Sequence, residues 1–182
     1  MNFIRKIILK RFFAFGIDYL IIVLYALLLF WISSLFNPVD FTPLQGQLIG
    51  FATLTLPVFL YFYFTEKSKF RATIGKRIMN IIVTNDNSIL GRKVFVRNFL
   101  KFLPWEIAHL GIHWIVYYSK LKSTPPDWVL IALILPQFIV VGYLISILLY
   151  KGQYSLYDKV ANTKIEINQQ SKLNQHNSVI KY

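Results

Sequence analysis

The sequence contains long, nearly uninterrupted apolar runs, and they constrain the fold more than any other feature. The two longest are Phe12–Leu35, with 24 residues, and Trp128–Tyr150, with 23 residues. An α-helix rises about 1.5 Å per residue, so about 20 apolar residues cross the ~30 Å hydrocarbon core of a bilayer. Lipid offers the backbone no hydrogen-bond partner, so such a segment must pair its own amides and carbonyls as a helix. The runs therefore predict an all-α transmembrane protein.

The composition supports this class and excludes several kinds of site. Of the 182 residues, 55% are hydrophobic and 15% are charged, whereas about 25% are charged in a typical soluble domain. The chain has no cysteine, which excludes disulfides, thiolate metal sites and cysteine nucleophiles. Its length is sufficient for one domain.

Basic residues decide between three and four membrane spans. A four-helix membrane bundle with both termini in the cytoplasm places 18 of the 20 Lys and Arg residues on the cytoplasmic side, where basic loops are enriched. A chain in which residues 102–118 lie at the interface without crossing places only 15 there. The four-span arrangement is the better fit, although the margin is small. The predicted spans are residues 12–35, 48–64, 102–118 and 128–150.

The polar segments beside these spans complete one domain. Residues 65–101 and 151–167 predict a small basic cytoplasmic element, so that a single membrane domain covers residues 1–167. The net charge is +12, and its clustering next to apolar spans favours contact with anionic lipid head groups over nucleic acid. Residues 168–182 are rich in Asn, Gln and Ser, which predicts a disordered polar tail.

The first span carries a polar stripe on an otherwise apolar helix. Arg11, Asp18 and Tyr25 are spaced seven residues apart, a spacing that rotates each by only about 20° around a helix from the one before. The side chain of Arg11 is long enough to reach the interface, but that of Asp18 is too short and must face protein or water. Two interpretations stay open: Asp18 is a structural acceptor that fixes helix packing, or it binds a cation or proton.

Four segments in order resemble the RDD family of small bacterial membrane proteins. They are RFFAFGIDYL, FRATIGKRIMNIIVTNDNSIL, VRNFLKFLP and SLYDKVANTKIEI. By this resemblance Arg11, Asp18 and Asp158 are the Arg and the two Asp residues of the family's name. Asn80 departs from the pattern, because a glycine is common there. The resemblance implies an integral protein of the bacterial plasma membrane, and cation/proton exchange has been proposed for some relatives.

The second aspartate is expected to contact the first helix. Asp158 follows the last span on the side that carries Arg11, and guanidinium–carboxylate pairs form strong, directional contacts. Ile81–Thr84 and Thr163–Ile167 both read as strands. If the two strands pair, they bring Asp158 toward Arg11. Two interpretations then stay open. The Arg11–Asp158 pair has a structural role and holds the first helix to the C-terminal segment, or Arg11 alternates between Asp18 and Asp158.

A second polar group lies in the third span. Glu106, His109 and His113 are spaced three and four residues apart, so they share one face of a helix. A carboxylate-bridged di-iron site needs a second Glu-x-x-His motif and two further glutamates, and the chain lacks them. The three residues therefore predict a polar stripe that faces the bundle interior or a wet cavity. They are also able to join Asp18 in a proton path.

Two functions follow as alternatives. The first is a small transporter or cation/proton exchanger with Asp18 as the site for a monovalent cation or a proton. It is expected to be a homo-oligomer, because four short helices enclose little space. The second is a non-transporting scaffold or accessory subunit in which the Arg and Asp residues hold the fold. Nothing in the sequence combines a nucleophile, a base and an oxyanion site, so we expect no enzyme, no cofactor and no metal.

Overall fold

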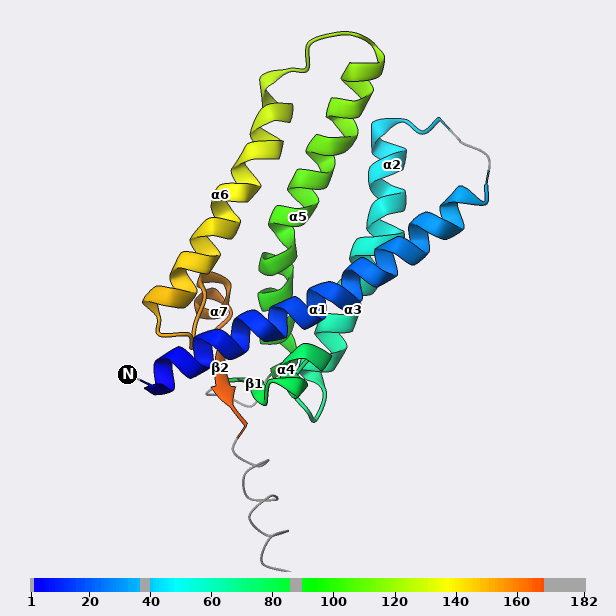
Figure 1. Cartoon of the computed structure of the whole chain (residues 1–182). Coiled ribbons are helices and arrows are strands. Elements are labelled where there is room, and N and C mark those ends of the chain that lie inside the picture. The colour runs from blue at the N-terminus through cyan, green and yellow to red at the C-terminus, as the bar shows by residue number, and fades with distance from the viewer. Residues whose placement is uncertain (1, 37–39, 86–89, 169–182) are drawn as a thin grey trace, which may run out of the picture.

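The structure is a computed structural model that describes residues 2–36, 40–85 and 90–168. These residues are mostly helical, with one two-stranded sheet (Figure 1). The predicted tail, residues 168–182, lies outside the described residues except for Asn168. In chain order the elements are α1 (Asn2–Ser34), α2 (Pro43–Gly50), η1 (Phe51–Thr55), α3 (Leu56–Lys67), α4 (Ile74–Ile78), β1 (Ile81–Thr84), α5 (Leu90–Lys120), α6 (Asp127–Leu149), α7 (Leu156–Val160) and β2 (Lys164–Ile167).

Three of the described helices are long and apolar enough to cross a membrane. They are Ile4–Ser34, Pro43–Lys67 and Asp127–Leu149. The predicted spans 12–35, 48–64 and 128–150 lie almost entirely within them. The predicted span 102–118 lies in α5, which is not among the three because it carries more polar residues. The chain is therefore a multi-pass membrane protein, and the fourth crossing stays a prediction.

The second of these helices is continuous but changes its winding in the middle. The α-helical turns of α2 pass into the π-helical turn η1 and then into α3, which begins with Pro57 in its first turn. A proline has no amide proton to donate to the carbonyl four residues earlier, here that of Thr53. The Tyr25 hydroxyl donates to this carbonyl at 2.7 Å. The first helix thus supplies a donor where the proline removes one.

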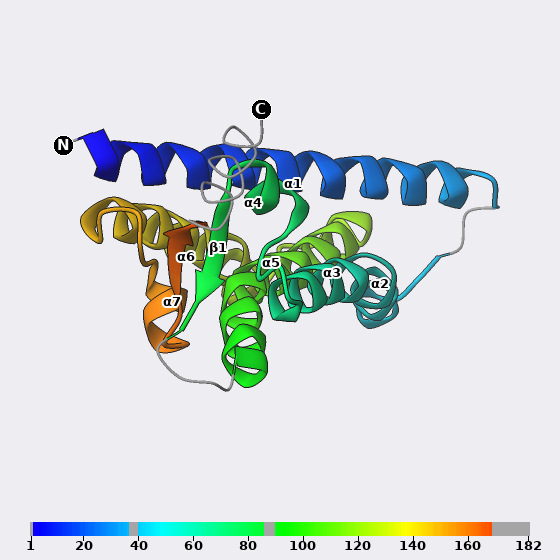
Figure 2. The ribbon, with the colours of Figure 1, turned by 90° about the horizontal axis from the view of Figure 1, so that it is seen from below.

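α5 is the central helix of the molecule. It forms a long hairpin with α6 on one side and packs on α2 and α3 on the other (Figure 1). α1 runs along one side of this arrangement, next to α4 (Figure 2). Its basic N-terminal residues continue the helix, so that α1 begins ten residues before the predicted span.

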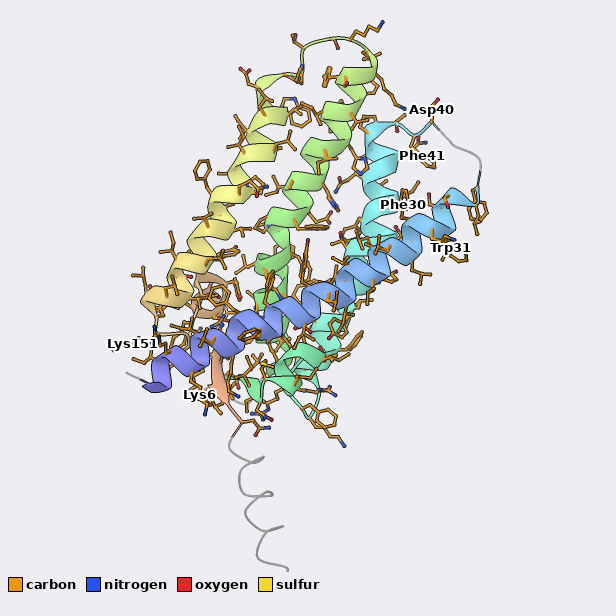
Figure 3. The ribbon with its side chains drawn as sticks, viewed as in Figure 1. Lys6, Phe30, Trp31, Asp40, Phe41 and Lys151 are labelled. Carbon is orange, nitrogen blue, oxygen red and sulfur yellow. The ribbon has the colours of Figure 1, made fainter. Side chains whose placement is uncertain are left out.

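The short elements gather at one end of the molecule, where a small core joins them to α1. β1 and β2 are antiparallel, with Ile81 opposite Ile167 and Thr84 opposite Lys164, so the predicted strand pairing is confirmed. Ala14 of α1 packs with Ile81, Val83 and Ile165 of the sheet. Figure 3 shows Lys6 and Lys151 at this end and Asp40 and Phe41 at the other. We call the end that carries the sheet the sheet end.

Candidate functional site

Two groups of polar residues stand out in the structure, and they contain most of the residues singled out in the sequence; Asp18 and Tyr25 lie outside both groups. The first, the sheet-end cluster, is a set of buried charges from five helices: Arg11, Glu66, Lys76, Arg97 and Asp158. The second, the Glu106 site, lies between the second apolar helix and α5. It consists of Gln47, Thr55, Glu106, His109 and His113.

Asp158 is held by two guanidinium groups. Its carboxylate lies 2.9 Å from Nη2 of Arg11 and 3.1 Å from Nη1 of Arg97. The predicted Arg11–Asp158 pair is therefore present. The Ser155 amide and hydroxyl also donate to Asp158, which closes the capping box at the start of α7. Burial alone would raise the pKa of the Asp158 carboxyl, but Arg97 and then Arg11 outweigh it and hold that pKa below its ordinary value.

Arg97 connects this pair to a second buried carboxylate. Its Nε lies 3.5 Å from Oε2 of Glu66 at the end of α3, and Lys76 of α4 forms an ion pair with the other oxygen of Glu66. Asn98 donates to Glu66 at 3.1 Å. Burial would lower the pKa of Arg97, but Asp158 and Glu66 outweigh it and keep that pKa above its ordinary value. The cluster thus ties α1, α3, α4, α5 and α7 together through opposite charges.

Asp18 is satisfied separately, by donors from α3 and the start of α4. Its carboxylate accepts from the Thr73 hydroxyl at 2.5 Å, the Tyr61 hydroxyl at 3.0 Å and the Gly75 amide at 3.0 Å. Asp18 is only 2% exposed. A carboxylate held by hydroxyls and a helix N-terminal amide has the surroundings of an anchor for α4. Arg11, Asp18 and Tyr25 do share the inner face of α1, yet each contacts a different element.

Glu106 has a different environment from these carboxylates. Oε2 accepts from the Gln47 amide at 2.8 Å, and Oε1 accepts from the Thr55 hydroxyl. Trp105 in turn donates to Thr55 at 3.3 Å. Apart from His109, no basic side chain in the described part of the chain lies within ion-pair distance of Glu106. The Glu106 side chain is 22% exposed. It is therefore a carboxylate between apolar helices whose hydrogen-bond donors are neutral groups.

The two histidines complete this site. Nδ1 of His109 lies 4.0 Å from Oε1 of Glu106. The His113 ring lies against Gly46, where a Cβ would come within 2.7 Å of Nδ1. Glycine at this position lets the imidazole approach the backbone of α2. The predicted polar stripe on α5 therefore faces a neighbouring helix, and the described residues contain no group of three side chains suited to a metal ion.

The sequence analysis missed part of both groups. Glu66 and Arg97 were not singled out, and Lys76 was counted only among the basic residues expected at lipid head groups. All three lie in or beside the segments that resemble the RDD family. Gln47 and Thr55 were also missed. The side-chain carbonyl oxygen of Gln47 is buried and has no hydrogen-bond donor among the described residues. A polar side chain in a predicted span is a signal that would have found Thr55, whereas Gln47 lies just before the predicted span 48–64.

The comparison with known proteins identifies a family but no individual relative. The sequence pattern of the RDD family matches residues 7–162 of the chain, which include both polar groups. No curated protein and no solved structure matches the chain.

Proposed function

The chain belongs to the RDD family, and we propose that this multi-pass membrane protein exchanges a monovalent cation for protons at the Glu106 site. The observation that carries the proposal is the environment of Glu106: a carboxylate beside an apolar membrane helix, hydrogen-bonded by neutral groups and not paired with Lys or Arg. Ionisable groups at such positions are costly and commonly mark ion or proton pathways. Among the described residues no Lys or Arg has to be displaced from Glu106, so it is available to a proton or to a cation.

The surrounding oxygens suit a cation without its hydration shell. The carboxylate of Glu106, the hydroxyl of Thr55 and the unpartnered carbonyl oxygen of Gln47 all belong to this site. Hard cations take oxygen ligands, and protein carbonyls are able to replace water around a monovalent ion. Binding a cation requires the charged carboxylate, whereas a proton neutralises it. The two ligands therefore compete for Glu106, and this competition couples their movement.

The proposed topology places this site inside the bilayer. We infer four spans, with residues 102–118 of α5 as the third and with both termini in the cytoplasm of a bacterial plasma membrane. Two features support this: α5 and α6 form a hairpin (Figure 1), and Lys6 and Lys151 both lie at the sheet end (Figure 3). Four helices enclose little space, so we also propose a homo-oligomer in which a second copy completes the pathway.

The alternative function is a scaffold or accessory subunit that transports nothing. One observation favours it: the carboxylates of Asp18, Glu66 and Asp158 are each held by several donors or cations. These contacts support a structural role for the residues that give the family its name. The sequence-based proposal that Asp18 itself carries the ion is less well supported than the same proposal for Glu106.

The test is an exchange assay on purified protein in liposomes. A pH gradient is imposed, Na⁺, K⁺ or Li⁺ is added, and a pH-sensitive dye follows the lumen. Wild type is compared with Glu106→Gln, with Asp18→Asn, and with Glu166→Gln as a matched control on the sheet. Each variant is first checked for folding by its thermal midpoint in detergent.

Exchange by Glu106 predicts that an added cation collapses the gradient in wild type and in Glu166→Gln. In folded Glu106→Gln the gradient should collapse at least about tenfold more slowly than in wild type, because a neutral amide cannot alternate between a proton and a cation. A folded Glu106→Gln protein that exchanges at the wild-type rate would contradict the assignment. If wild type collapses the gradient with none of the cations, the scaffold is favoured, and one stoichiometric partner should be recovered from membranes.

A further inference from the structure

A groove at the sheet end has the features of a binding site, and Glu106 is not among the residues that line it. It has a volume of about 850 Å³ and lies between the start of α1, the loop that follows α3, and the two strands. Ile7 lines it on α1, Arg71 and Arg77 line it on the loop and on α4, and Ile82 and Glu166 line it on the sheet. The loop begins directly after Lys67, where an apolar helix ends, so the groove lies at a boundary between lipid and water.

The charge of the groove is strongly positive. Lys69, Arg71 and Arg77 all line it, and among the described residues none of these three has a carboxylate within ion-pair distance. The one acidic residue of the lining, Glu166, lies 3.0 Å from Nζ of Lys164. Three basic side chains around one open space favour an anionic ligand.

The guanidinium of Arg77 is already held in place, and so is the backbone of Arg71. Nε of Arg77 donates to the Ala72 carbonyl at 3.0 Å, and the guanidinium lies 4.1 Å from the centre of the Phe70 ring. No side chain or carbonyl of the described residues accepts from the two terminal nitrogens of Arg77, which leaves them for a ligand. Arg71 has a left-handed backbone with φ of 50°, and its carbonyl accepts from Val83 of β1 at 2.8 Å. A guanidinium held in one orientation loses little entropy when it binds a phosphate with its planar fork.

Apolar side chains adjoin the same residues. Phe70 is 52% exposed, Ile74 43% and Ile78 55%. They belong to the loop and helix that carry Arg71 and Arg77. Free phosphate requires only the basic side chains, whereas a lipid presents an anionic head group and acyl chains together. Basic residues beside exposed apolar ones therefore favour lipid.

We propose that this groove binds the phosphate of an anionic lipid head group. Arg71 and Arg77 bind the phosphate, Lys69 adds to the positive field, and Phe70, Ile74 and Ile78 contact the start of the acyl chains. The site is independent of the exchange proposed for Glu106. The lipid would contact the segment that joins the second apolar helix to the sheet.

The test measures lipid binding in detergent, where no bilayer competes. Purified protein is titrated with dioctanoyl phosphatidylglycerol, with dioctanoyl phosphatidylcholine, and with inorganic phosphate, and the thermal midpoint is recorded. The double variant Arg71→Gln/Arg77→Gln removes the proposed ligands. Lys120→Gln/Lys122→Gln removes the same charge at the opposite end of α5. Arg71→Lys/Arg77→Lys keeps the charge and removes the fork, which provides a second test if the Gln variant fails to fold.

The proposal predicts that phosphatidylglycerol raises the midpoint of wild type and of the Lys120/Lys122 control equally. The Arg71/Arg77 variants should bind at least tenfold more weakly. Equal binding of phosphatidylcholine would overturn the preference for an anionic head group, and an equal effect of inorganic phosphate would overturn the role of the lipid. Unchanged affinity in both Arg71/Arg77 variants would overturn the site.

Discussion

The sheet-end cluster and the Glu106 site both place carboxylates between helices, but they satisfy them in opposite ways. Asp158 and Glu66 are fully buried, and each lies between cationic side chains. Glu106 is partly exposed and accepts from an amide and a hydroxyl. A buried carboxylate with fixed cations around it holds elements together, because losing either partner leaves an unpaired charge. A carboxylate with neutral partners has no such fixed charge beside it, and this difference is the basis of the exchange proposed for Glu106.

The largest effect is expected at Arg97, because it pairs with both carboxylates of the cluster. Arg97→Met leaves Asp158 and Glu66 each short of a cation and should lower the free energy of unfolding by about 3–5 kcal/mol. Chemical denaturation of the purified protein in detergent measures this. Arg92→Met is the matched control, because Arg92 is exposed on the same helix, and its effect should stay within about 0.5 kcal/mol. Equal effects of the two substitutions would show that the cluster does not hold the fold.

A Glu→Gln substitution should lower the free energy of unfolding more in the sheet-end cluster than in the Glu106 site. Glu66→Gln removes the charge that Lys76 and Arg97 face and should cost about 1.5–3 kcal/mol of unfolding free energy, the range for hydrogen bonds to charged groups. Glu106→Gln should cost less than about 1 kcal/mol, because the new amide can accept from Thr55 and, once the Gln47 amide turns over, donate to the oxygen of Gln47. Denaturation of both variants in one detergent provides the comparison. A larger loss for Glu106→Gln would assign Glu106 to the structural group.

The sequence predicts the elements of this molecule better than the contacts between them. Apolar length predicts the helices around Asp18 and Val140, and strand-like alternation predicts the pairing of Ile81–Thr84 with the C-terminal strand. Seven-residue spacing places Tyr25 on the face of α1 that carries Arg11 and Asp18. In the structure, Pro57 leaves the Thr53 carbonyl in need of a donor. That Tyr25 supplies this donor depends on how two helices cross, which spacing alone does not specify.

The candidate site shows the same limit. Arg11 and Asp158 could be paired from the sequence because both lie beside predicted spans on one side of the membrane. Arg97 and Glu66 are ordinary charged residues in a basic segment until α3 and α5 pack together. The Glu106–Gln47 contact likewise joins residues 59 positions apart in sequence. Such partners are fixed by tertiary packing, for which a single sequence contains no local signal.

A smaller effect is expected where α4 closes over Asp18. A Cβ at Gly75 would collide with the carbonyl oxygen of Ala14, whereas at Gly16 it would meet nothing within 4 Å. Gly75→Ala should therefore separate α4 from α1 and lower the free energy of unfolding by about 1–3 kcal/mol. Gly16→Ala on α1 should be neutral, or stabilising by up to about 1 kcal/mol, because alanine favours a helix. Thermal midpoints of the two variants in detergent test the contact, and equal midpoints would refute it.

The last expected effect is a pH dependence of stability at Lys101, which follows Arg97 by one turn of α5. Its Nζ lies 3.5 Å from the centre of the Phe62 ring. Burial, together with repulsion from Lys76, lowers the pKa of Lys101 to about 7. An unfolded lysine has a pKa of about 10.4. Below pH 7 both states hold the proton, and the folded state bears the full cost of the buried charge. Between about pH 7 and 10.4 the unfolded chain binds more protons, so Lys101 makes the unfolding free energy rise with pH.

Lys101→Met removes this dependence without removing the cluster. At pH 6 the variant should be more stable than wild type, and the difference should shrink as the pH approaches 10, because folded wild-type Lys101 is then neutral and no longer bears the cost of a buried charge. Denaturation at pH 6, 8 and 10 measures the difference, with Lys122→Met at the exposed end of the hairpin as the control. A difference that stays constant over this range would mean that Lys101 keeps its proton in the folded protein. Lys101 would then belong with the permanently charged cluster.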